Sequence, residues 1–132
     1  MAKLETIYES IGGQPVVDRI IDSLYKHIGS NDILLPIFPD DLQESARKQR
    51  LFLTQFFGGP PLYAQEIGRP MLPYRHQPFE ITPSRRDAWL ECMFKALTEA
   101  GVEEPHFSDI MGRLMIPAHN IVNTPETASE KG

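Results

Sequence analysis

Three side chains that donate hydrogen bonds fall on the apolar faces of three different helical patterns. Tyr25, Gln49 and Trp89 each share a face with hydrophobic residues. A buried tyrosine or tryptophan usually needs a partner for its O–H or N–H group, and a buried glutamine brings two donors and one acceptor. A single inward tyrosine or tryptophan is more often part of a core. Together, the three donors predict a polar cavity whose ligand accepts hydrogen bonds.

A fourth candidate, His76, lies between Pro73 and Pro78 in a long irregular stretch. A connection of about twenty residues without regular structure is unusual in a compact domain unless it has a function. No HExxH, CxxC or CxxCH motif is present, so neither zinc catalysis nor a covalently attached cofactor is supported. The remaining histidines are interpreted as structural or surface residues: His27, His106 and His119.

Four helices are expected to position these residues. Apolar residues at helical spacing predict helices over residues 14–28, 40–57, 82–100 and 105–122, and no segment alternates like a strand. Asp40 and Gln43 are predicted to form a capping box, and Thr82 to cap the third helix. Residues 62–81 are expected to be irregular, apart from a short helical turn near Tyr74–His76. The polar residues after Asn123 predict a frayed tail.

Length and composition are typical of one soluble domain. The chain has 132 residues, a single cysteine (Cys92) and a net charge of −5. The lone cysteine favours a reducing compartment, and the acidic charge disfavours nucleic acid as a partner. The sequence contains no apolar stretch long enough to span a membrane, and no signal peptide is recognised. We therefore expect a cytoplasmic protein with one domain over residues 1–132, a core over about 4–122 and a flexible tail over 123–132.

The order and spacing of several motifs resemble those of one known family. From the N-terminus, these motifs are Gly12-Gly13, Tyr25, Pro36-Ile37-Phe38, Ala46-Arg47-Lys48-Gln49, Phe56-Phe57-Gly58-Gly59-Pro60, Met71-Leu72, Arg75-His76, Phe79, Ile81 and Trp89. This set, over about residues 4 to 122, resembles the truncated haemoglobins, and Trp89 with its surrounding pattern is similar to their second group.

The resemblance implies an all-α fold, a two-over-two helical sandwich around a non-covalently held haem b. His76 matches the proximal iron ligand, which leaves the opposite position open for a diatomic ligand. Tyr25, Gln49 and Trp89 match the distal hydrogen-bond donors. Ser45 falls where conventional globins carry a distal histidine, and Phe38 matches an aromatic residue that packs on the haem.

Further haem contacts follow from the same resemblance and from charge. Lys48, Tyr63 and Arg75 are assigned to the haem propionates, whereas Arg47 and Arg50 are expected to remain solvated. The apolar cage around the haem is expected to consist of Phe52, Leu53, Met71, Leu72, Phe79, Ile81 and Met115.

The resemblance implies reversible binding of O2, with CO, NO and peroxide as further ligands. Two or three donors on bound O2 predict slow release and high affinity. Oxygen transport, storage, sensing and redox chemistry all stay open as roles. The enzymatic alternative is turnover of peroxide or NO, which requires a separate reductase because no flavin or nicotinamide domain is present. A third interpretation, a cofactor-free helical interaction module, predicts a protein without a Soret band.

Overall fold

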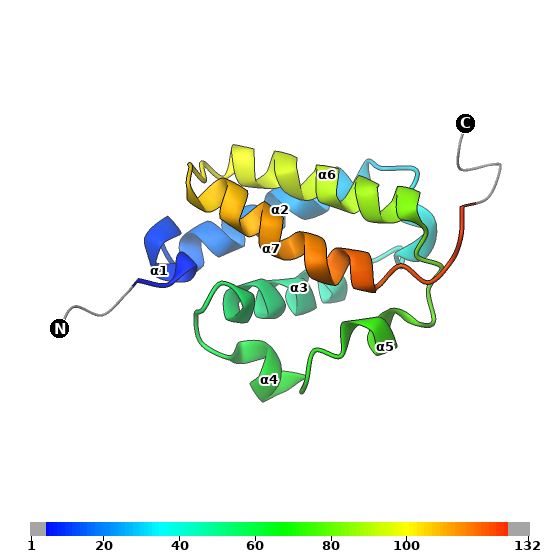
Figure 1. Ribbon diagram of the computed structural model, residues 1–132, viewed down its shortest axis with the longest axis horizontal. Helices are drawn as coiled ribbons and strands as arrows, with labels where there is room; N and C mark the ends of the chain where they lie inside the picture. Colours follow the sequence, from blue (N-terminus) through cyan, green and yellow to red (C-terminus); the bar gives the residue numbers. More distant parts are fainter. Residues whose placement is uncertain (1–4, 127–132) are drawn as a thin grey trace.

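The fold is built entirely from helices over residues 5–126, the part of the chain that the structure, a computed structural model, describes. In chain order the elements are α1 (Ile7–Ile11), α2 (Gln14–Gly29), the 3-10 turn η1 (Leu35–Ile37), α3 (Gln43–Phe56), α4 (Leu62–Glu66), α5 (Leu72–His76), α6 (Pro83–Glu99) and α7 (His106–Asn120). The four long helices form two pairs, α2 with α3 and α6 with α7, and α2 packs along α6 (Figure 1). The predicted all-α two-over-two arrangement is confirmed.

The core lies between the long helices because each carries one apolar stripe. In α2 the stripe comprises Val16, Val17, Ile20, Ile21, Leu24 and Ile28, all less than a tenth exposed. Met93 and Leu97 of α6 and Ile110 and Leu114 of α7 close the core from the other side. Each such side chain stabilises the fold by about 1.5–3 kcal/mol through removal of apolar surface from water.

The two predicted helix starts have different outcomes. Thr82 caps α6 as expected, because its hydroxyl accepts a hydrogen bond from the Arg85 amide at 3.2 Å. The predicted Asp40 capping box is wrong, since α3 begins at Gln43. The N-cap residue is Leu42, whose side chain forms no capping hydrogen bond, and the Asp41 carboxylate one residue earlier accepts from the Gln43 amide at 2.9 Å.

Two short helices, α1 and α4, were not predicted, because five residues are too few to show helical periodicity. A capping box holds α1: the Thr6 side chain accepts from the Glu9 amide, and the Glu9 carboxylate accepts from the Thr6 amide. The helix docks where α3 ends. A Cβ atom on Gly59 would lie 2.7 Å from the Tyr8 ring and 2.9 Å from the Thr54 carbonyl oxygen, so this contact requires glycine.

Residues 58–80 form a thin layer beside the core. Within this range Tyr63 alone is buried, and α4 and α5 lie at the bottom of Figure 1, with α4 against α3 and α5 against α7. The short helical turn predicted near Tyr74–His76 is confirmed as the end of α5. The candidate residue His76 therefore lies in a segment that contributes little to the core.

The chain after α7 is ordered for longer than expected. A frayed tail was predicted from Asn123 onward, but Asn123 and Thr124 both donate backbone hydrogen bonds to the Ile81 carbonyl, at 3.0 and 3.2 Å. The polar composition of this segment serves hydrogen bonding rather than solvation alone. The rest of the predicted tail, residues 127–132, lies outside the described residues. No helix within residues 5–126 is both long and apolar enough to cross a membrane.

Candidate functional site

A cavity of about 830 Å³ lies between α3, α5, α6 and α7. Its size falls within the range of roughly 300–1,000 Å³ that encloses ligands of several hundred daltons. Apolar and aromatic side chains make up much of its lining, including Leu34, Ile37, Phe38, Phe52, Tyr63, Ile67, Leu72, Phe79, Ile81, Leu114, Pro117, Ala118 and Ile121. The remaining lining residues are mostly polar or cationic, so the cavity fits a large apolar ligand with a few polar groups.

His76 lines this cavity from the C-terminal end of α5. Its Nδ1 atom lies 2.7 Å from the Leu72 carbonyl oxygen. Because a carbonyl oxygen can only accept, Nδ1 carries the proton in this contact, and in the neutral ring Nε2 keeps its lone pair. In metal-binding histidines, the ring nitrogen that does not bind the metal usually donates such a hydrogen bond, which fixes the ring orientation and its tautomer. The geometry therefore gives His76 one free ligand atom.

The chain turns sharply before the helix that carries His76. Met71 adopts the left-handed conformation (φ 40°, ψ 50°) immediately before α5. This conformation costs a non-glycine residue about 1 kcal/mol or more. The turn allows Pro73 to occupy the first turn of α5, where its missing N–H group costs nothing.

The three predicted donors line the same cavity from three other helices, Tyr25 from α2, Gln49 from α3 and Trp89 from α6. The Tyr25 hydroxyl lies 2.8 Å from the Ser45 hydroxyl, and the Phe38 ring packs edge-on against the Tyr25 ring at 6.3 Å. If Ser45 donates in this pair, the Tyr25 proton is free to point at a ligand. Gln49 and Trp89 have no hydrogen-bond partner within residues 5–126, so a cavity ligand can use their N–H groups.

Burial raises the pKa of Tyr25 to about 12, although its hydrogen bond to Ser45 acts in the opposite direction. Tyrosine in an unfolded chain titrates near pH 10. The Tyr25 phenol therefore stays protonated at neutral pH and acts there as a hydrogen-bond donor.

This shift predicts an alkaline transition that belongs to Tyr25. Because the folded state disfavours the phenolate, the stabilising effect is complete below roughly pH 10 and is lost as the pH rises toward 12. Tyr25→Phe should remove the highest phenolate step from an ultraviolet titration and reduce the loss of stability over that pH range. Tyr74→Phe, which removes an exposed phenol, is the matched control. A parent protein whose phenols all ionise near pH 10 would contradict the prediction.

The cavity is lined by more positive than negative side chains, in a chain whose net charge is −5. Lys48, Arg75, Arg85 and Arg86 line it, together with one carboxylate, Glu44. Lys48 forms no ion pair within residues 5–126. A ligand with carboxylate groups fits this charge distribution. Two nearby cations do not line the cavity: Arg47, paired with Glu44 and Glu66, and Arg50, paired with Asp18. Arg47 is exposed, as predicted, whereas Arg50 is only part-exposed and its Nε atom is buried.

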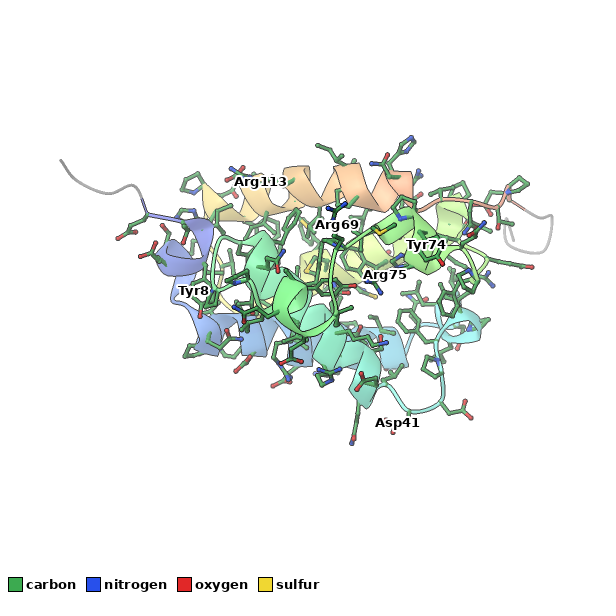
Figure 2. All side chains as sticks on the ribbon, turned by 90° about the horizontal axis from the view of Figure 1, so that it is seen from below. Tyr8, Asp41, Arg69, Tyr74, Arg75 and Arg113 are labelled. Carbon is green, nitrogen blue, oxygen red and sulfur yellow. The ribbon has the colours of Figure 1, made fainter. Side chains whose placement is uncertain are left out.

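Arg75 has a structural role in addition to its place at the cavity. Its Nε donates to the Pro70 carbonyl at 2.9 Å and its Nη2 to the Arg69 carbonyl at 3.0 Å. The guanidinium also lies over the Tyr63 ring, 5.7 Å from its centroid. Figure 2 shows Arg69, Tyr74 and Arg75 near one another in this region. The Nη1 group has no partner within residues 5–126, which leaves it available for a carboxylate.

Most predicted site residues line the cavity, but three do not. Leu53 is fully buried in the core, one residue past Phe52 on α3. Met115 is 55% exposed, since it lies about 100° around α7 from Leu114, which does line the cavity. Met71 is 54% exposed at its left-handed turn. These three residues of the predicted apolar cage therefore do not line the cavity.

Residues that the sequence analysis did not assign to the site replace them. From α7, Leu114, Pro117, Ala118 and Ile121 line the cavity at i, i+3, i+4 and i+7 spacing. That spacing falls within the helix predicted over residues 105–122, but none of these four residues was assigned to the site. Other lining residues that were not assigned to the site include Leu34, Ile37, Ile67, Arg85 and Arg86. Apart from Arg85 and Arg86, they come from loops, or from a turn and a helix end where periodicity gives no signal.

The site fits a metal whose other ligands come from a macrocycle. No group of three or more His, Cys, Asp or Glu side chains that could hold a metal ion occurs in the described part of the chain. His76 offers one nitrogen, the walls are apolar, and Lys48 and Tyr63 offer polar groups at the lining. These features fit a haem, which needs one axial nitrogen, apolar contacts for its face and partners for its two propionates.

Comparison with known proteins points to one family. The sequence pattern described as bacterial-like globin matches residues 6–123. The group 2 truncated haemoglobin YjbI of Bacillus subtilis is 48% identical over 119 residues, which cover 90% of this chain and 89% of that protein.

Solved structures agree in fold. The group II truncated haemoglobin from Bacillus anthracis has a TM-score of 0.93 at 46% identity, covering 98% of this chain and 99% of that one. A protein described as a truncated oxygen-avid haemoglobin from Bacillus subtilis has a TM-score of 0.86 at 47% identity, covering 90% of this chain and all of that one. The haemoglobin of the thermophile Chloroflexus aurantiacus has a TM-score of 0.87 at 45% identity, covering 91% of this chain and 99% of that one.

Proposed function

Because the chain belongs to the bacterial-like globins and, within them, to the group II truncated haemoglobins, we propose that it holds haem b and binds O2 reversibly with high affinity. One observation carries the proposal: a single cavity is lined by His76, with its free Nε2, and by the donors Tyr25, Gln49 and Trp89. The oxygen-avid description of the Bacillus subtilis relative supports the same affinity class.

Different residues of this chain would bind the iron and the propionates of the haem. His76 Nε2 would provide a nitrogen ligand for the iron, and its Nδ1–H bond to Leu72 keeps the ring in one orientation. Lys48, Tyr63 and the Nη1 group of Arg75 are the groups for the propionates. When bound, haem supplies an iron that takes a diatomic ligand at its open position.

Three donors would then stabilise the diatomic ligand. Each N–H or O–H group aimed at a bound ligand with partial negative charge would slow the release of that ligand. Tyr25 remains protonated because its pKa is raised to about 12. Gln49 and Trp89 have no competing partner within residues 5–126. The apolar walls strengthen these hydrogen bonds by keeping the local dielectric low.

The proposal is tested by the absorption spectrum and the O2 affinity of the purified protein. The Soret band of the reduced protein is expected to shift when CO is added, and O2 titration should give a dissociation constant well below that of a globin that releases O2 quickly. A protein that takes up no haem when haem is offered contradicts the proposal and favours the cofactor-free helical module.

A second candidate function is the turnover of peroxide or NO. The oxidisable side chains of Tyr25 and Trp89 line the cavity, which favours this candidate. Electrons would come from a separate reductase. Repeated turnover with peroxide or NO and a reductant distinguishes this candidate from a single stoichiometric reaction.

We further place the protein in the cytoplasm, because its single cysteine, Cys92, is buried and unpaired.

A further inference from the structure

Asn123, three residues past the end of α7, contacts the segment that follows His76. Its Nδ2 group donates to the Phe79 carbonyl at 2.9 Å and to the His76 carbonyl at 3.2 Å. Its Oδ1 atom accepts from the Ile81 amide at 2.9 Å. One side-chain amide thus uses both donors and its acceptor on three backbone groups of a six-residue segment.

Backbone hydrogen bonds strengthen this contact. The Asn123 and Thr124 amides both donate to the Ile81 carbonyl. Two residues further along, the Glu126 carboxylate accepts from the Ser84 amide at the start of α6. The segment after α7 therefore pairs with residues 76–84, 42 or more positions earlier in the chain.

The contact fixes the main chain of the same histidine whose ring is fixed by Leu72. The His76 carbonyl accepts from Asn123 and also from the Phe79 amide at 3.0 Å. Phe79 and Ile81, whose backbone groups also bond to the Asn123 side chain, line the cavity. The ring of His76 is thus held at Nδ1 by Leu72 of the same helix, and its backbone carbonyl is held by Asn123 from a distant part of the chain.

We propose that Asn123 is a positioning residue, which sets the orientation of His76 toward a haem by tying residues 76–81 to the end of α7. The proposal rests on the proposed function, because it requires His76 to be the iron ligand. Only an amide satisfies all three partners. Aspartate keeps the acceptor for Ile81 and loses both donors, and alanine loses all three contacts.

The test compares the haem-loaded parent with Asn123→Asp and Asn123→Ala. Asn120→Asp and Asn120→Ala are matched controls, since Asn120 is an exposed asparagine three residues away with no hydrogen bond from its side chain within residues 5–126. The readouts are the iron–histidine stretching band of the reduced protein in resonance Raman spectra, the rate of haem transfer to an excess of an acceptor apoprotein, and the unfolding midpoint.

Loss of the two donated hydrogen bonds in Asn123→Asp is expected to shift and broaden the iron–histidine band and to speed haem transfer roughly threefold to tenfold. Both Asn120 variants should match the parent. If Asn123→Ala does not fold, Asn123→Asp alone decides, because it keeps the bond to Ile81. A lowered unfolding midpoint with an unchanged band would show that Asn123 only stabilises the fold and would overturn the proposal. A parent without an iron–histidine band overturns the proposed function itself.

Discussion

Replacing His76 by glycine should produce a protein that loses haem at least roughly a hundredfold faster than the parent. Changes in groups that merely orient a metal ligand typically cost 10- to 100-fold in affinity, so loss of the ligand itself should cost about that much or more. The small side chain leaves space at the former ring position. Free imidazole should therefore enter and restore the parent Soret band and its response to CO. The measurements are haem transfer to an acceptor apoprotein and optical spectra with and without imidazole.

His106→Gly is the matched control, because His106 lies at the start of α7 and does not line the cavity. It should retain haem like the parent and show no response to imidazole. If His76→Gly keeps the parent spectrum and haem-loss rate without imidazole, another residue ligates the iron, and the assignment of His76 is wrong.

Replacing Tyr25 by phenylalanine should speed O2 release by about five- to a hundredfold, the range expected for the loss of one charge-assisted hydrogen bond of about 1–3 kcal/mol. Gln49→Leu and Trp89→Phe should each fall in the same range. Stopped-flow dissociation of O2 measures the effect directly. CO serves as the comparison ligand, because it gains much less negative charge and depends less on donors.

Tyr74→Phe provides the control, since Tyr74 is 69% exposed. Tyr74 lines the cavity, but it belongs to α5 next to His76 and not to the helices that carry the donors. Its O2 release rate should match the parent. Equal acceleration of O2 and CO release in Tyr25→Phe would indicate a wider path to the iron rather than a lost hydrogen bond. Unchanged O2 release in all three donor variants would contradict the proposed distal site.

The parts of the fold that sequence predicted are those with long periodicity or a clear cap. The stripe of α2 and the Thr82 cap of α6 were both predicted, because each depends on residues close together in the chain. His76 could be singled out because prolines flank it in an otherwise irregular stretch. Its place at the cavity depends on α5 and on the turn at Met71, which local sequence does not encode clearly.

What sequence could not predict is the choice between neighbours and the contacts between distant segments. Leu114 and Met115 are both apolar and adjacent, and only the rotation of α7 about its axis directs one to the cavity and the other to solvent. Asn123 looked like the start of a polar tail, because its partners lie more than forty residues earlier. Pairings at such separation leave no periodic signal.

The thin layer formed by residues 58–80 has a consequence for how the protein acquires its cofactor. The core cluster draws its side chains from residues outside this range, so the layer opens at a lower free energy than the four long helices do. Haem touching His76 and Phe52 would tie this layer to α3 and raise its protection against amide exchange. Haem binding is then coupled to the ordering of residues 58–80. The free energy of haem binding must offset the conformational entropy that this layer loses when it becomes ordered.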